Sequence, residues 1–333
     1  MLRKGIGILF CILCACKDIN ENEAGGFSQT VLDQEKVFAI DTTFPIGDVR
    51  RYGIDSLGLD IKHPVTKEST VTTILDISEE LGIEIYFPKG YYDFGLNIDS
   101  RKNIKIKFDN SEFSDVIHIT NEKGSKSENI ILKGTLITYD RFGTYESNNI
   151  QIDSLIIKSD KNKQKRNLNS RGLHIYTNTT NLSIDYLQVD GLGDDSINNH
   201  AAIAIDGWPA YPKNIKIKKA KVNSSDRHGV YLMGFNHKID TLIIKNYALG
   251  SSANMSLMQG AQRGEEKEFS GIWFNECYST NIGFLKIETK KIDKKQSDIK
   301  FDIGDKNYPI LINELYNNNS IIRNNYSGEI IKQ

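Results

Sequence analysis

Cysteine is scarce in this chain, and its distribution removes one common source of stability. Three of the four cysteines lie within the first sixteen residues, as Cys11, Cys14 and Cys16, and Cys277 stands alone beyond them. The long remainder can therefore form no intramolecular disulfide. Because roughly 300 residues are ample for a large apolar core, we expect packing to stabilise the fold.

Several other features are missing, and each absence narrows the function. The apolar run from Gly5 to Leu13 is too short to span a bilayer. The formal net charge of −1 argues against a nucleic-acid partner. No spacing of His, Cys and Glu suggests a zinc site, and the sequence has neither a phosphate-binding glycine-rich loop nor a nucleophile elbow. We therefore expect no cofactor, apart from calcium under one alternative below.

The N-terminus predicts export and anchoring. A basic start, Met1 to Lys4, precedes the apolar run, which ends in Leu13-Cys14-Ala15-Cys16 and resembles a bacterial lipobox. The acidic stretch from Lys17 to Glu23 is similar to the tether of Bacteroidetes-type surface lipoproteins. These resemblances imply a signal peptide over residues 1–15, a lipidated Cys16 with a flexible tether over 16–36, and a domain held at the outer membrane, exposed at the surface. An ordinary secretory signal is the alternative.

A repeated motif predicts the architecture of residues 37–333. An Ile-x-x-(Leu/Ala/Gly)-x-(Val/Ile/Leu) pattern begins at Ile131, Ile152, Ile184, Ile217, Ile239 and Ile282. A second series of short alternating segments covers 172–176, 202–206, 229–233 and 271–275. Short period-two strands between Asn- and Gly-rich corners indicate a solenoid whose turns share one core. We predict an all-β fold, a single-stranded right-handed parallel β-helix.

The first part of the domain agrees with this interpretation. A helix is expected from about Ser69 to Leu81, followed by a strand that ends in Phe87-Pro88-Lys89-Gly90-Tyr91. This order resembles the opening of pectin-lyase-like proteins, in which a short helix covers the end of the solenoid. The resemblance spans nearly the whole domain and implies a cap over about 37–92. It implies a fold but not a reaction, because this fold carries many functions.

Strand alternation predicts which side chains face solvent. If Leu173, Ile203, Val230 and Ile272 point inward, their neighbours form an outer column of His174, Ala204, Tyr231 and Trp273. Gly172, Gly229 and Gly271 carry no side chain, so we expect them to leave space for a ligand at the base of this column. Rings beside charged groups suit an extended glycan, although an outward ring is often simply packed under a loop. The expected substrate-binding residues are Arg171, His174, Tyr176, His200, Asp206, Tyr231 and Trp273.

Acidic residues before the second of these strands suggest hydrolysis. Gly193-Asp194-Asp195, with His228-Gly229 downstream, resembles polygalacturonase-type glycoside hydrolases. The resemblance implies acid and base roles for Asp194 and Asp195 and a supporting imidazole at His228. No Asp stands near Asn169-Ser170-Arg171, where that family has another, and Asp226 or Asp206 could supply it. The alternative is that Gly193-Asp194-Asp195 is only a solvated turn without a catalytic role.

The turn Arg227-His228-Gly229 permits a different reaction. It is similar to a turn of chondroitinase B and alginate lyases, which implies proton transfer by Arg227 and a calcium ion on the uronate. The Lys that this family uses as base has no counterpart in residues 202–207. Because the acids outnumber nearby lysines, we expect a monomeric protein that hydrolyses an acidic polysaccharide. The alternatives are a uronate lyase and a non-catalytic glycan-binding protein.

Overall fold

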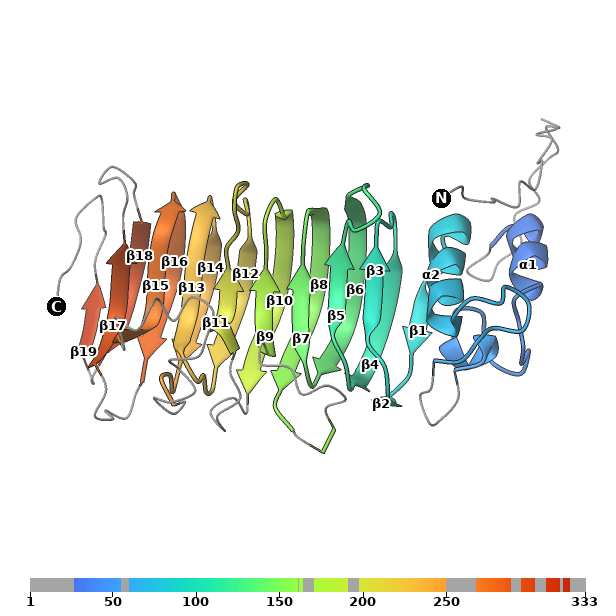
Figure 1. Cartoon of the computed structure of the whole chain (residues 1–333), viewed down its shortest axis with the longest axis horizontal. Helices are drawn as coiled ribbons and strands as arrows, with labels where there is room; N and C mark the ends of the chain where they lie inside the picture. Colours follow the sequence, from blue (N-terminus) through green and yellow to red (C-terminus); the bar gives the residue numbers. More distant parts are fainter. Residues whose placement is uncertain are drawn as a thin grey trace.

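The computed structural model describes residues 27–54, 60–160, 162–163, 171–190, 198–249, 268–288, 295–302, 310–317 and 320–323. They form an elongated stack of strands with two α-helices at its N-terminal end (Figure 1). The chain alternates between two sheets, so each turn adds one strand to each of them. The fold is a parallel β-helix with a short N-terminal capping helix, and the predicted fold class is confirmed.

The eight-stranded sheet forms the face that concerns function. In chain order its strands are β3 (Leu96–Asp99), β5 (Ile117–Thr120), β7 (Arg141–Thr144), β9 (Arg171–Ile175), β11 (Asn198–Ile205), β13 (His228–Phe235), β15 (Glu268–Tyr278) and β17 (Lys295–Asp302). Each strand pairs in parallel with the next one in this series.

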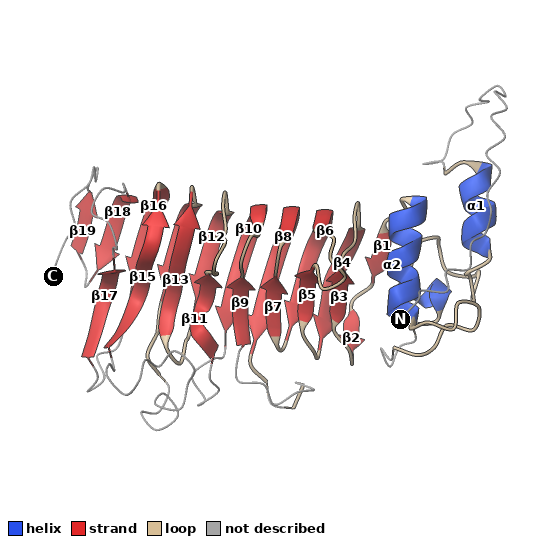
Figure 2. Ribbon diagram, turned by 45° about the horizontal axis from the view of Figure 1, so that its top comes forward, coloured by secondary structure: helices blue, strands red, loops and turns tan. Residues whose placement is uncertain are grey.

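The second sheet has eleven strands and lies against the first. Its members are β1 (Ile85–Phe87), β2 (Gly90–Tyr92), β4 (Lys105–Phe113), β6 (Ser127–Thr138), β8 (Ser147–Lys158), β10 (Thr180–Asp190), β12 (Lys216–Val222), β14 (Lys238–Ile244), β16 (Thr280–Ile287), β18 (Ile310–Asn317) and β19 (Ser320–Arg323). Only β19 runs antiparallel, along β18, among these described strands. Figure 2 shows strands forming the whole body of the stack beyond the helices.

The core contains a ladder of aliphatic side chains, with one member from each of five successive turns. Ile152, Ile184, Ile217, Ile239 and Ile282 are register partners on successive strands, and each is at most 1% exposed. The predicted repeat is therefore confirmed for these five turns, whose shared packing stabilises each of them.

The first repeat is displaced by one residue from its predicted alignment. Leu132, and not Ile131, is the partner of Ile152, and the pairing of β6 with β8 shifts once more between Leu132 and Thr135, so that Leu136 pairs with Leu155. Gly134 lies at this irregularity with a φ of 74°. Such a bulge adds a residue to one strand only, and a fixed spacing in the sequence does not reveal it.

One corner of the solenoid repeats an asparagine. Asn103, Asn129, Asn149, Asn181, Asn214 and Asn236 all have φ between 51° and 59°. Asparagine tolerates this left-handed conformation better than most residues. The side-chain amides also bond along the stack, with Nδ2–Oδ1 distances of 2.7 Å from Asn149 to Asn129 and 2.9 Å from Asn214 to Asn181. The corner thus fixes both the turn and the stacking of neighbouring turns.

Helix α2 (Thr70–Leu81) covers the N-terminal end of the core, as the sequence predicted. It begins where Ser69 Oγ accepts a hydrogen bond from the Thr72 amide at 3.0 Å, and it ends at Gly82, whose φ is 70°. Ile74 and Ile77 are buried against the first turn. The helix therefore protects apolar side chains that an open end would expose.

A second helix lies beyond α2 and corrects one boundary. Residues 29–36, which we expected to belong to a flexible tether, form helix α1 (Gln29–Lys36). Its Glu35 is buried and accepts two hydrogen bonds from Arg51, at 2.6 and 3.0 Å, in the 3₁₀ helix η1 (Val49–Tyr52). A buried, bidentate ion pair fixes α1 to the cap, so the tether expectation is wrong for these residues.

The predicted signal peptide and the lipidated Cys16 lie outside the described residues. Across the part of the chain that the structure describes, no helix is long and apolar enough to cross a membrane. The N-terminal expectations therefore stay predictions.

Candidate functional site

The outward face of the eight-stranded sheet carries the predicted column. His174, Ala204, Tyr231 and Trp273 are register partners on β9, β11, β13 and β15. The inward neighbours Leu173, Ile203, Val230 and Ile272 are at most 1% exposed. The strand register derived from alternation is thus confirmed. The column also continues beyond the prediction, to His118 and Gly143 on one side and Lys300 on the other.

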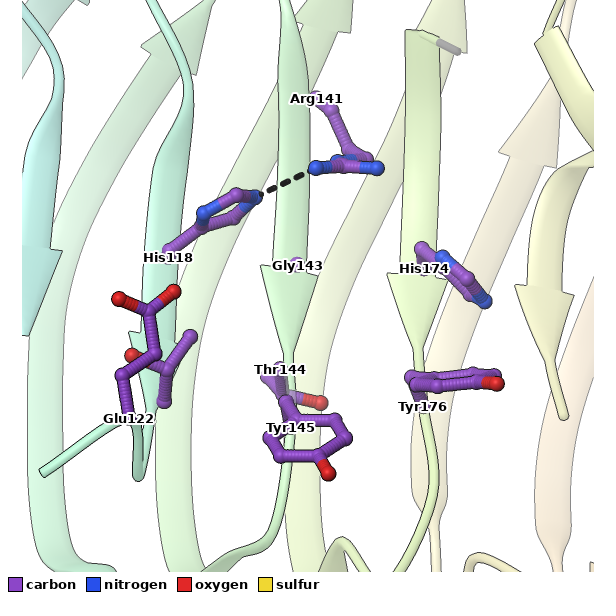
Figure 3. Close-up of a pocket in the computed structure, with 9 residues that line it drawn as sticks. His118, Glu122, Arg141, Gly143, Thr144, Tyr145, His174 and Tyr176 are labelled. Carbon is purple, nitrogen blue, oxygen red and sulfur yellow. Dashed lines mark hydrogen bonds between the residues drawn. The ribbon is translucent and has the colours of Figure 1, made fainter. Parts of the chain in front are cut away.

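A pocket of about 380 Å³ opens on this face over β5, β7 and β9 (Figure 3). Its chemistry comes from His118, Glu122, Arg141, Tyr145, His174 and Tyr176. Two of these, His174 and Tyr176, were predicted as substrate-binding residues. The other four belong to turns that precede the predicted region.

Gly143 makes the room in the centre of the pocket. A Cβ atom placed on this glycine would lie 2.9 Å from Cδ2 of His118 and 3.8 Å from Nε of Arg141. A side chain here would push the His118 ring away from its present position, while the contact with Arg141 would be an ordinary one. The absence of a side chain at position 143 therefore lets His118 and Arg141 approach each other over the strand.

The glycines that we expected at the floor have another role. A Cβ atom on Gly229 would meet the Ile244 side chain at 2.7 Å, and one on Gly271 would meet Ile287 at 3.0 Å. Both isoleucines belong to the core. On Gly172 the added atom would lie 2.5 Å from the Ala202 carbonyl oxygen. These glycines permit close packing of the turns, so the expectation of an open floor above them is wrong.

Arg141 and His118 form a cationic end of the pocket. The Arg141 Nη2 donates a hydrogen bond to His118 Nε2 at 2.9 Å, which requires that nitrogen to be unprotonated. Burial lowers the pKa of Arg141, and the neighbouring Asp140 carboxylate opposes that shift. A guanidinium keeps its charge near neutral pH even so. A desolvated cation at this point is suited to a carboxylate or sulfate group of a ligand.

The other side of the pocket is aromatic and acidic. The rings of Tyr145 and Tyr176 stack at a centroid distance of 5.9 Å with an interplanar angle of 24°. His174 lies 4.8 Å from Tyr176, and its Nε2 donates to Asp206 Oδ1 at 2.7 Å. Figure 3 shows Glu122 on the same side of the pocket as the two tyrosines. A ligand here would meet flat rings and a carboxylate opposite the cation.

The predicted cluster Asp226, Arg227 and His228 is buried, with 1%, 3% and 3% of each residue exposed. Its turn is fixed by Ser225, whose Oγ donates to the His228 carbonyl at 2.7 Å and accepts from the Arg227 amide at 3.3 Å. Burial lowers the pKa of Arg227 to about 10. The cluster is therefore packed inside the protein and does not project from an open face.

His228, Tyr231 and Trp273 form one packed group of rings. The Trp273 ring lies 4.9 Å from His228 and 4.8 Å from Tyr231 between centroids. The Ser270 amide donates to His228 Nδ1 at 2.9 Å, and Asn275 Nδ2 donates to the Tyr231 hydroxyl at 2.6 Å. Tyr231 is only 6% exposed, whereas Trp273 is partly exposed. Of these three residues, Trp273 is the one with the greater access to solvent.

The side chains of four predicted residues lie outside the described part of the structure. Asp194 and Asp195 lie outside the described residues. For Arg171 and His200 the structure describes the backbone alone, at the start of β9 and within β11. Within the ranges that the structure does describe, no group of three or more His, Cys, Asp or Glu side chains is arranged to hold a metal ion.

The sequence contained a signal for the residues that were missed. Ile117-His118-Ile119 and Phe142-Gly143-Thr144 alternate as the later strands do, with Ile117, Ile119 and Phe142 fully buried. Extending the outward column two turns towards the N-terminus would have found His118 and, with it, the neighbouring Arg141. The hydrogen bond between His118 and Arg141 joins two neighbouring turns. Alternation within a strand does not predict such contacts between turns.

Comparisons of the chain with protein-family models, with curated proteins and with solved structures find no match. The class of the protein is accordingly defined by its fold, a parallel β-helix, and by the pocket on its eight-stranded sheet.

Proposed function

We propose that this protein is a carbohydrate-active β-helix of the pectin-lyase-like kind, which binds an acidic polysaccharide in the pocket and cleaves its glycosidic bonds. The observation that carries the proposal is the Arg141–His118 pair facing the stacked Tyr145 and Tyr176 rings within one pocket. In the cell we propose that lipid on Cys16 holds the domain at the outer membrane, where polysaccharides are accessible.

The lining supports an acidic sugar as the ligand. The Arg141 guanidinium can form two parallel hydrogen bonds with a uronate carboxylate, and burial strengthens such a contact. Tyr145 and Tyr176 present apolar ring surface beside it, which suits the face of a sugar. A neutral glycan could use the rings but would make no charged contact with Arg141. The pocket therefore favours a chain that carries carboxylates.

Two cleavage reactions are compatible with this ligand. Hydrolysis requires two carboxyl groups across the scissile bond, and Asp194 and Asp195 are the candidates from the sequence. Elimination is a second candidate, because Glu122 is the one carboxylate among the described residues that line the pocket. In that reaction Arg141 would neutralise the uronate carboxylate, and an imidazole or tyrosine would remove the C5 proton next to it. The C4–O glycosidic bond would break as the C4=C5 double bond forms, and a protonated side chain or water would give a proton to the leaving oxygen.

A polysaccharide screen tests the proposal. Purified protein is incubated with acidic and neutral polysaccharides, and products are identified by mass spectrometry and by the ultraviolet absorbance of unsaturated uronates. Saturated products indicate hydrolysis and unsaturated products indicate elimination. Binding without any product would contradict cleavage, and failure to bind any acidic polysaccharide would contradict the whole proposal.

A conservative substitution links the activity to the pocket. Arg141→Lys keeps the charge but loses the planar fork, so affinity for the acidic chain should fall about tenfold to a hundredfold. Arg50→Lys is the matched control, because Arg50 pairs with Asp48 in the cap, far from β7 in the fold. Equal affinities for wild type and both variants would show that the pocket is not the binding site.

A further inference from the structure

One aromatic side chain on the body of the solenoid is unusually exposed. Trp208 is 73% exposed, more than any other large apolar side chain in the described ranges. The other exposed ones in those ranges, from Phe27 to Tyr91, all belong to the N-terminal part. Trp208 lies in the loop between β11 and β12, where no other large apolar side chain in the described ranges is exposed to this degree.

The loop that carries Trp208 is fixed on its β9 side. The Ala210 carbonyl accepts hydrogen bonds from the Thr177 hydroxyl at 2.8 Å and from the Asn178 amide at 2.6 Å. Gly207 packs so closely that an added Cβ would lie 2.5 Å from the Thr177 Cα. The loop therefore rests directly on the residues that follow Tyr176 of the pocket.

A second set of contacts fixes the loop on its β13 side. The Tyr211 ring lies 6.0 Å from Phe235, which in turn stacks on Tyr278 at 4.6 Å with an interplanar angle of 12°. The Tyr211 hydroxyl also donates to Glu276. Trp208 itself only touches the edge of this group, at 6.4 Å from Tyr211. The exposed Trp208 ring thus projects from a loop that is anchored on both sides.

Trp208 is adjacent to the pocket. The chain reaches it from Asp206, which accepts the hydrogen bond of His174 in the pocket wall. Two residues along the chain span at most about 7.6 Å between Cα atoms. Because Gly207 packs against Thr177, the residue after Tyr176, a polysaccharide bound over Tyr145 and Tyr176 and continuing towards β11 would pass the loop that carries Trp208.

We propose that Trp208 forms an outer sugar-binding position for the next part of the polysaccharide chain that occupies the pocket. This inference rests on the proposed function. An indole offers the largest flat apolar face of any side chain, and the anchored loop reduces the backbone entropy lost on binding. Glu276 and Lys213 flank its aromatic neighbours and can bond sugar hydroxyls. A single exposed ring is too small for a stable protein interface, which favours a sugar as the occupant.

The test compares affinity with chain length. Calorimetric titration uses galacturonate, mannuronate and chondroitin fragments, from disaccharide to octasaccharide, with wild type, Trp208→Ala and Trp208→Phe. Trp208→Ala should bind the long fragments about tenfold more weakly, the loss expected for one ring contact, and bind the shortest fragments as wild type does. Trp208→Phe should keep most of the affinity. Val65→Ala, at another exposed apolar residue, is the control.

The outcomes separate this inference from the proposal beneath it. If wild type binds none of the fragments, the proposed function fails and the outer position fails with it. If wild type and Arg141→Lys differ but Trp208→Ala matches wild type at every length, the outer position alone is refuted. Equal weakening at every length, or a change of oligomeric state in Trp208→Ala, also refutes it, since the ring would then act within the pocket or between proteins.

Discussion

His237 lies in the corner between β13 and β14, where it makes the stability of the protein depend on pH. Its Nε2 donates to the Met233 carbonyl at 2.9 Å, and its Nδ1 accepts from the Ile215 amide at 3.3 Å. Only the neutral ring can do both, because a protonated Nδ1 would face the Ile215 N–H. Burial lowers the pKa of His237 to about 4, against an opposing effect of the Met233 hydrogen bond.

The sign and size of the effect follow from this shift. In the unfolded chain the imidazole has its ordinary pKa of about 6.5, so between pH 6.5 and pH 4 the unfolded state binds the additional proton. The stability is fully present above pH 6.5 and is lost as the pH falls towards 4. The loss is about 2 kcal/mol at pH 5 and about 3 kcal/mol at pH 4.

Urea unfolding of wild type and His237→Gln, followed by tryptophan fluorescence, measures this effect. Glutamine does not titrate, so the stability difference between the two proteins should shrink by about 2 kcal/mol from pH 8 to pH 5. Carboxylates that titrate in both proteins cancel in that difference. Asn236→Ala, at the same corner, should lower stability by a similar amount at both pH values. A difference between wild type and His237→Gln that is the same at pH 8 and pH 5 would refute the reasoning.

Three further predictions concern the core, the corner and the N-terminus. Ile239→Ala should lower the free energy of unfolding, measured in urea, by about 2–5 kcal/mol, because Ile239 is buried in the core. Lys238→Ala, at the outward neighbour, should change it by less than about 0.5 kcal/mol. Similar losses in the two variants would mean that the register is wrong. Asn214→Ala removes two rungs of the asparagine ladder and should cost about 1–3 kcal/mol, whereas an unchanged unfolding midpoint would show that the ladder contributes nothing. Cys16→Ser should leave the protein unlipidated and soluble after expression in a bacterial host, and continued partition into the membrane fraction would contradict a lipid anchor.

The strand register could be predicted because solenoid turns repeat a simple rule. Alternation alone identified Leu173, Ile203 and Val230 as core residues, and each is buried. The rule failed near Gly134, because a bulge there adds a residue to β6 alone and separates Leu132 from Leu136 by four residues instead of three. The asparagine corner was visible as composition, but its ladder depends on amides that meet only after the turns have stacked.

The candidate site was harder to predict than the fold. His174 and Tyr176 were found because they lie in the aligned strands, and they line the pocket. The burial of Arg227 was not visible, because its turn is held by the amide of Ala248, whose place depends on the chain beyond β14. Arg141 was missed since its strand precedes residues 172–176, where the second aligned series begins. Contacts between turns, rather than the pattern within each turn, determine these features.

The asparagine corner has a consequence for how such a protein can change over generations. Connections there are short: residues 145–146, 236–237 and position 279 link successive strands. The connections that return to the eight-stranded sheet vary far more in length, from 139–140 to 159–170 and 245–267. The segment that carries Trp208 is longer as well, and it is accommodated before Asn214 begins the next strand. Insertions and deletions can therefore accumulate mainly along the edge at which the chain enters the eight-stranded sheet, beside Arg141 at the start of β7, while the aliphatic ladder stays intact. A lineage, or a laboratory library, could exchange these segments to obtain new specificities from an unchanged scaffold.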